Sequence, residues 1–219
     1  MRRLMFSLCL LLAGHWLHGV HAGELRVYAT DHDGNALEDA VFLATPTDPA
    51  KMPQLKPHKE IVDQIDKEFV PTVKPVLVGS LVYFPNKDNI RHHVYSFSSA
   101  KNFELPLYAG KSAPPVFFDK PGVVVLGCNI HDWMVGYIYV SDTPFFAKTA
   151  RDGKGTIENL PIGEYLVRAW HPRLDTTNAE GSRRVSITDG VPARIDWQLL
   201  LKPAFKIPRA PIGGNDHHY

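Results

Sequence analysis

The chain has few cysteines, almost no net charge and no long apolar run beyond its first residues. Only two of its 219 residues are cysteine, so a disulfide framework does not hold the fold together. Lys and Arg number 24 against 23 Asp and Glu, which leaves no basic surplus of the kind that binds nucleic acid. Glycine-rich phosphate loops and a Ser-His-Asp spacing are also missing. The 44% of apolar residues is enough to bury a substantial core.

The N-terminus predicts a cleaved secretory signal peptide over residues 1–22. Two arginines precede an apolar stretch from Leu4 to Ala13, which is too short to cross about 30 Å of hydrocarbon. Val20 and Ala22 are small enough for the −3 and −1 positions of a cut after Ala22. We therefore expect a periplasmic chain with no membrane-inserted segment after cleavage. A membrane anchor is the alternative.

Loss of the signal peptide changes what the cysteine count implies. Cys9 lies inside the signal peptide, and Cys128 then remains alone. A single cysteine in an oxidising compartment has no partner within its own chain. Cys128 is therefore a free thiol, an intermolecular link or a metal ligand.

Short apolar runs bounded by Gly, Pro and Asp predict an all-β chain. Six such runs lie between Val73 and Val140, which is typical of a sandwich or barrel, and the regions on both sides have the same pattern. The exception is the stretch from Glu60 to Phe69. Its apolar residues recur at every fourth position, which predicts one short amphipathic helix.

The regions before and after the middle block are similar to two parts of one sandwich. The segment from Asp31 to Ala40, followed much later by Asp152-Gly153 and Leu160-Pro161-x-Gly163, resembles a carboxypeptidase-regulatory or transthyretin-like β-sandwich. The middle block occupies a loop of that sandwich, and exposed loops tolerate inserted domains. The predicted divisions are a discontinuous outer domain over 23–49 and 148–202, a linker with the short helix over 50–68, an inserted domain over 69–147 and a disordered tail over 203–219. A single larger sandwich is the alternative.

Three residues with metal-binding side chains follow a predicted strand at three-residue intervals. They are Cys128, His131 and Met134. A thiolate, an imidazole and a thioether are ligands that suit copper in both Cu(I) and Cu(II) states. A second imidazole is available upstream in His92-His93. A buried Cys beside a Met more often only packs, but the fixed spacing and the upstream histidines favour a metal site.

On these residues, the segment 69–141 resembles the cupredoxins, in particular their plastocyanin and amicyanin-like branch. The matching motifs are Phe69-x-Pro71, the run from Val78-Gly79 to Asn86-x-Asp88, His-x-Val at 92–94, and Gly-Cys-x-x-His-x-x-Met from Gly127. The histidine run is similar to periplasmic copper proteins often labelled methylamine utilisation proteins. The resemblance implies a cupredoxin Greek-key β-sandwich, inserted in the small transthyretin-like sandwich, that binds one type 1 copper ion.

The resemblance also implies a ligand set. Cys128, His92 and His131 would form the trigonal plane, and Met134 would be the weak axial ligand. We expect His92 rather than His93 to bind, since the family's strand has the pattern His-x-Val and neighbouring strand residues point to opposite faces. His93 takes a position where the family commonly has Asn.

The implied function is one-electron transfer with redox partner proteins, and no enzymatic activity is expected. Copper storage or delivery with the same ligands is the alternative. A structural module that has lost its metal is a third possibility, which the complete ligand set disfavours. A copper oxidase would need further histidine clusters, and the sequence has none.

Overall fold

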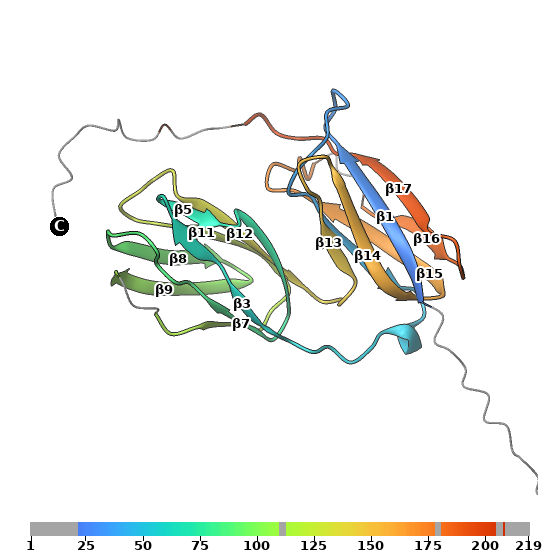
Figure 1. Cartoon of the computed structure of the whole chain (residues 1–219), viewed down its shortest axis with the longest axis horizontal. Helices are drawn as coiled ribbons and strands as arrows, with labels where there is room; N and C mark the ends of the chain where they lie inside the picture. Colours follow the sequence, from blue (N-terminus) through green and yellow to red (C-terminus); the bar gives the residue numbers. More distant parts are fainter. Residues whose placement is uncertain (1–21, 110–112, 178–180, 205–207, 209–219) are drawn as a thin grey trace, which may run out of the picture.

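A computed structural model describes residues 22–109, 113–177, 181–204 and 208, and these are almost all in β-strands or their connections (Figure 1). The prediction of an all-β chain is confirmed. Within the described residues, the only helical element is the three-residue η1 (Pro49–Lys51). The structure therefore describes no helix that is long and apolar enough to cross a membrane. Residues 1–21 of the predicted signal peptide and most of the predicted disordered tail lie outside the described residues, and Ala22, the last residue of the predicted signal peptide, is the first residue of β1 (Ala22–Thr30).

One sandwich, here called the outer sandwich, combines strands from both ends of the chain. Its sheets have the strand orders β14-β1-β17 and β13-β2-β15-β16. The strands are β1 (Ala22–Thr30), β2 (Val41–Pro46), β13 (Phe146–Lys148), β14 (Lys154–Pro161), β15 (Gly163–Trp170), β16 (Arg183–Ile187) and β17 (Ala193–Gln198). Alternate residues of β1, including Leu25 and Val27, point into a core with Phe42 and Trp197. This alternation is the period of two expected for strands with one buried face.

The inner sandwich is built from the middle of the chain. A five-stranded sheet of order β6-β12-β11-β8-β9 faces a three-stranded sheet of order β10-β7-β3, and β4 pairs with β5. The strands are β3 (Lys59–Ile61), β4 (Asp63–Ile65), β5 (Glu68–Val70), β6 (Val73–Leu77), β7 (Ser80–Tyr83), β8 (His92–Ser98), β9 (Lys101–Tyr108), β10 (Val116–Phe118), β11 (Gly122–Gly127) and β12 (Val135–Ser141). Its core includes Phe69, Phe84, Phe118 and Ile138.

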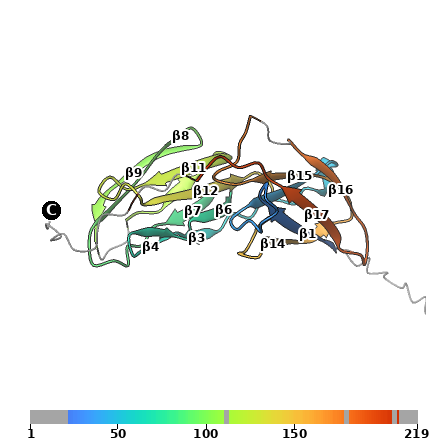
Figure 2. The ribbon, with the colours of Figure 1, turned by 90° about the horizontal axis from the view of Figure 1, so that it is seen from above.

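The two sandwiches lie end to end, and each has its own buried cluster (Figure 2). A smaller cluster joins them through Leu43 and Val73, which are fully buried. In that cluster the Trp170 ring lies 6.0 Å from the Tyr137 ring and 5.4 Å from the Tyr139 ring. We propose from these separate cores that the inner sandwich is an inserted domain. The transthyretin-like identity of the outer sandwich stays a prediction.

The helix predicted over Glu60 to Phe69 is wrong. This stretch contains β3, β4 and β5. A spacing of four residues is an even number, so it fits one face of a strand as well as one face of a helix. The φ angles of Asp66 and Lys67, 54° and 59°, form a left-handed turn that a right-handed helix excludes. Asp63 accordingly pairs with Lys87 at 2.7 Å and not with a residue one helical turn away.

His171, just after β15, is a buried titratable group of the outer sandwich. It is 8% exposed, and its Nδ1 accepts the backbone N–H of Arg173 at 3.1 Å. Burial, followed by the nearby Arg173 charge, lowers the pKa of His171 to about 4. The folded protein therefore holds this ring neutral at pH values where an exposed histidine is charged.

The lowered pKa of His171 predicts that the free energy of unfolding falls in acid over a defined range of pH. An unfolded His171 binds a proton near pH 6.5, and the folded chain does so only near pH 4, so stability falls as pH drops between these values and is unaffected above them. Between about pH 7 and pH 4 we expect the free energy of unfolding of the wild type to fall by about 3 kcal/mol more than that of His171→Gln. Urea unfolding across this range measures the difference. Parallel curves for the two proteins would show that His171 does not carry the effect.

Candidate metal centre

Three of the four predicted ligands meet at one end of the inner sandwich. The ligand atoms of His92, Cys128 and His131 all lie within 4.8 Å of one another, and all three residues are buried. Cys128 Sγ lies 3.7 Å from His131 Nδ1. The rings of His92 and His131 meet edge to face with centroids 4.9 Å apart. The structure therefore brings together a thiol and two imidazoles from segments more than thirty residues apart in sequence.

Strand pairing explains how these segments meet. The last pair of β11 and β12 is Gly127 with Val135, so the residues between them form a short loop at the sheet's end. The Met134 N–H donates to the His131 carbonyl at 2.9 Å, which closes a turn within that loop. Gly127 also pairs with Tyr95 of β8, and this brings the start of β8 beside the loop. His92 is the first residue of β8, and its ring meets the loop residues Cys128 and His131.

Met134, the fourth predicted ligand, is 1% exposed. It belongs to the same buried cluster as Cys128. The structure thus places the thioether in the core that surrounds the thiol. Met134 therefore shares the buried core with Cys128, and its thioether is the soft ligand type that the prediction requires.

The polar atoms of His92 show how well the group fits a metal ion. Its Nε2 bonds to Asp88 Oδ2 at 2.6 Å, and its Nδ1 is buried with no hydrogen-bond partner among the residues that the structure describes. An unpartnered buried nitrogen is costly, and a metal ion at Nδ1 would satisfy it. The Nδ1 of His93 is also unpartnered, but the His93 ring bonds to Glu104 at 2.8 Å and lies outside the ligand group. The residues present therefore fit a metal held by His92, Cys128 and His131.

The charges of the group favour a thiolate. Burial alone would raise the pKa of Cys128, but the adjacent His92 ring and hydrogen bonds from the backbone N–H groups of His93 and Ile130 hold that pKa below its usual range. Burial alone would lower the pKa of His92, and its contacts with Cys128 and Asp88 raise it instead. Cys128 is thus prepared to bind a cation as a thiolate, the form that ligates metals.

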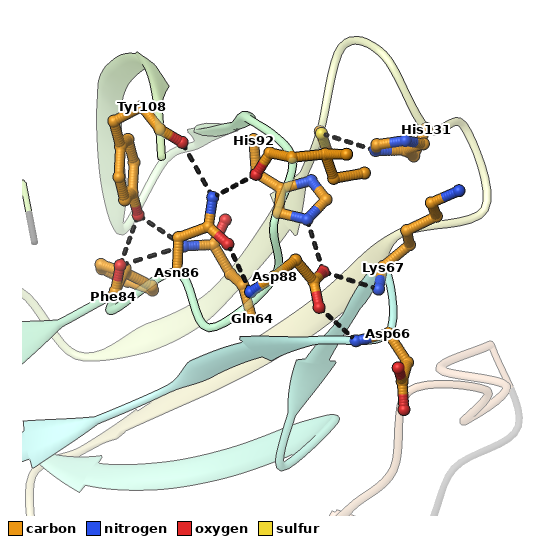
Figure 3. A network of polar contacts seen from close by, with 11 residues as sticks. Gln64, Asp66, Lys67, Phe84, Asn86, Asp88, His92, Tyr108 and His131 are labelled. Carbon is orange, nitrogen blue, oxygen red and sulfur yellow. Dashed lines mark hydrogen bonds and ion pairs between the residues drawn. The ribbon is translucent and has the colours of Figure 1, made fainter. Parts of the chain in front are cut away.

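A polar network supports the site from outside and was not foreseen from the sequence (Figure 3). Asn86 donates from Nδ2 to the carbonyls of Ile90 and Tyr108, both at 2.8 Å, and its Oδ1 accepts the Asp88 N–H at 3.0 Å. Gln64 donates to the Tyr108 hydroxyl at 2.5 Å. The only signal in the sequence is Asn86-x-Asp88 just before the histidines, and that pattern by itself does not say which backbone groups it holds.

Comparisons with known proteins found neighbours among solved structures alone. No protein-family model and no curated protein matches the chain. A Cu-containing nitrite reductase from Thermus scotoductus SA-01 is similar at 28% identity over 45% of this chain and 27% of that chain, with a TM-score of 0.37. A reduced Cu(I) form of an amicyanin variant is 21% identical over 45% of this chain and 98% of that chain, with a TM-score of 0.36. A purple cupredoxin from Nitrosopumilus maritimus is 24% identical over 38% and 99% of the two chains, with a TM-score of 0.33.

These similarities correct one expectation. The prediction that the chain is not an enzyme is contradicted, because the nitrite reductase among its neighbours is an enzyme. The chain spans 27% of that reductase. TM-scores this low carry no argument about function, so the ligand group itself has to support any assignment.

Packing under the metal loop gives a prediction about stability. Gly136 follows the loop in β12, and a Cβ added there would lie 2.8 Å from the Cβ of Phe69, which is 1% exposed. We expect Gly136→Ala to lower the free energy of unfolding by about 1–3 kcal/mol, because neither the strand nor Phe69 has space to move. Urea unfolding measures the change.

Gly181→Ala is the matched control, since a Cβ at Gly181 has nothing within 4 Å in the part of the chain that the structure describes. Equal stability of the Gly136 and Gly181 variants would contradict the close packing of β12 against Phe69.

Proposed function

We propose that the chain is a periplasmic type 1 copper protein that accepts and passes one electron. The observation that carries this proposal is the buried group of His92, Cys128 and His131, with the Nδ1 of His92 left unpartnered. Thiolate, imidazole and thioether together suit copper better than calcium or magnesium, which prefer oxygen ligands.

Each ligand would have a distinct role in binding the ion. Cys128 would bind as a thiolate, His92 and His131 through Nδ1, and Met134 as a weak axial ligand. Bound copper supplies the one-electron couple between Cu(I) and Cu(II). The protein holds the ligands on strand ends and in a closed turn, so they change position little when the charge of the ion changes. The backbone N–H groups of His93 and Ile130 act on the Cys128 sulfur and tune its electron donation.

Burial defines where electrons would enter and leave. His92 is fully buried and Cys128 is 3% exposed, whereas His131 is 9% exposed and lies next to Ile130, which is 46% exposed. Water is kept from the thiolate, and the imidazole of His131 is the ligand nearest the surface. A redox partner protein that docks on this loop would therefore approach the metal through His131.

Two further parts of the proposal rest on the sequence. The basic and apolar N-terminus supports export to the periplasm, and the histidine run supports a relationship to the proteins labelled methylamine utilisation proteins. The near-zero net charge supports redox partners that are not selected by strong electrostatic attraction.

Copper reconstitution of the chain lacking residues 1–22 tests the proposal. We expect an intense visible band from charge transfer between the Cys128 thiolate and Cu(II), and its complete loss in Cys128→Ser, because a hydroxyl does not replace the thiolate. Visible and EPR spectra measure both.

That comparison requires that the Cys128→Ser variant is folded, and circular dichroism checks this. A colourless Cu(II) complex of the wild type would contradict a type 1 site. A Cu(I) complex without a reversible one-electron couple in voltammetry would contradict electron transfer and support the copper-delivery alternative.

A further inference from the structure

Three hydrogen-bond donors converge on one carboxylate beside the metal centre. Asp88 Oδ1 accepts the backbone N–H of Asp66 at 2.7 Å, and Asp88 Oδ2 accepts the backbone N–H of Lys67 at 2.9 Å (Figure 3). Oδ2 also bonds to His92 Nε2 at 2.6 Å. The Asp88 side chain is 12% exposed and that of His92 is fully buried. The carboxylate therefore connects a turn of the backbone to a ligand imidazole with almost no access to water.

The turn that Asp88 holds has an uncommon backbone. Asp66 and Lys67 join β4 to β5, and both have left-handed φ angles, 54° and 59°. Two-residue turns of this kind favour Asn-Gly, since side chains with a Cβ are strained there. Acceptance of both amide protons by one carboxylate offsets part of that strain.

The third donor sets the state of the imidazole. A carboxylate only accepts, so His92 Nε2 carries a proton and donates it to Asp88. In the neutral ring the other nitrogen then has a free lone pair. That nitrogen, Nδ1, is the buried atom without a partner and faces the group that includes Cys128. A ligand histidine needs this tautomer, and a carboxylate on its far nitrogen also makes the ring a better electron donor.

We infer that Asp88 is a positioning residue of the metal centre, which fixes the His92 ring with Nδ1 open to the metal and ties that ring to the β4–β5 turn. The inference rests on the proposed copper site and adds a residue to it. Asp88 acts through His92 and does not contact the metal. Its negative charge, one imidazole away, stabilises the more highly charged Cu(II) more than Cu(I).

The test replaces Asp88 with the isosteric amide. In Asp88→Asn one acceptor oxygen becomes an NH₂ donor, which leaves too few acceptors for three donors and opposes the His92 Nε2 proton. We expect Cu(II) affinity, measured by chelator competition, to fall about 10–100-fold. Cu(I) affinity should fall less, so the reduction potential should become more positive. In the diamagnetic Cu(I) protein, the NMR signal of the hydrogen-bonded Nε2 proton should move upfield or disappear.

Asp63→Asn is the matched control. Asp63 lies in the β4–β5 hairpin, whose turn Asp88 holds, and its carboxylate pairs with Lys87 and not with His92. It should retain the affinity, the potential and the Nε2 proton signal of the wild type.

A rescue experiment separates positioning from simple support of the turn. Asp66→Asn with Lys67→Gly gives the turn the sequence it prefers. Added to Asp88→Asn, these changes should restore stability and leave the Cu(II) affinity low and the potential high. Recovery of both affinity and potential would overturn the inference, because Asp88 would then act only on the turn.

The outcomes also separate this inference from the proposed function. A wild type with the visible copper band and an Asp88→Asn variant with unchanged affinity, potential and Nε2 signal would overturn the role of Asp88 alone. A wild type without that band would overturn the proposed site, whatever the variant does.

Discussion

The proposed metal centre depends on the burial of a thiol and two imidazoles at the end of a β-sandwich. Each of these groups loses contact with water, and such a loss is tolerated only when partners replace it. Backbone N–H groups of His93 and Ile130 serve Cys128, and Asp88 serves one nitrogen of His92. The second nitrogen of His92 is left to be satisfied by a metal ion. The strands of the inner sandwich matter to function because they hold these groups in place despite the free-energy cost of removing them from water.

The group of His92, Cys128 and His131 could be predicted from sequence because the spacing of its loop members is local and the chemistry of its side chains is specific. The intervals from Cys128 to His131 and to Met134 lie within one loop, and the pattern His-x-Val favoured His92 over His93. The alternation of side chains expected along a strand was not needed for that choice, because the pairing of β8 with β9 is irregular between His92 and Val94. The structure groups His92, and not His93, with Cys128 and His131. The all-β class followed equally well from short runs and turn residues.

Two features could not be predicted from the sequence in this way. The residues from Glu60 to Phe69 have a four-residue period that helices and strands share, and only the left-handed turn at Asp66 and Lys67 decides between them. The role of Asp88 depends on where that turn lies in space, more than twenty positions earlier in the chain. Interactions of this kind come from the tertiary fold, and no local pattern reports them.

X-ray absorption spectroscopy of the copper-loaded chain tests the central claim most directly, because it reports the atoms bound to the metal without assuming a fold. We predict one short copper–sulfur distance and two copper–nitrogen distances, with the short copper–sulfur distance absent in Cys128→Ser. A spectrum of nitrogen and oxygen ligands alone in the wild type would contradict this prediction.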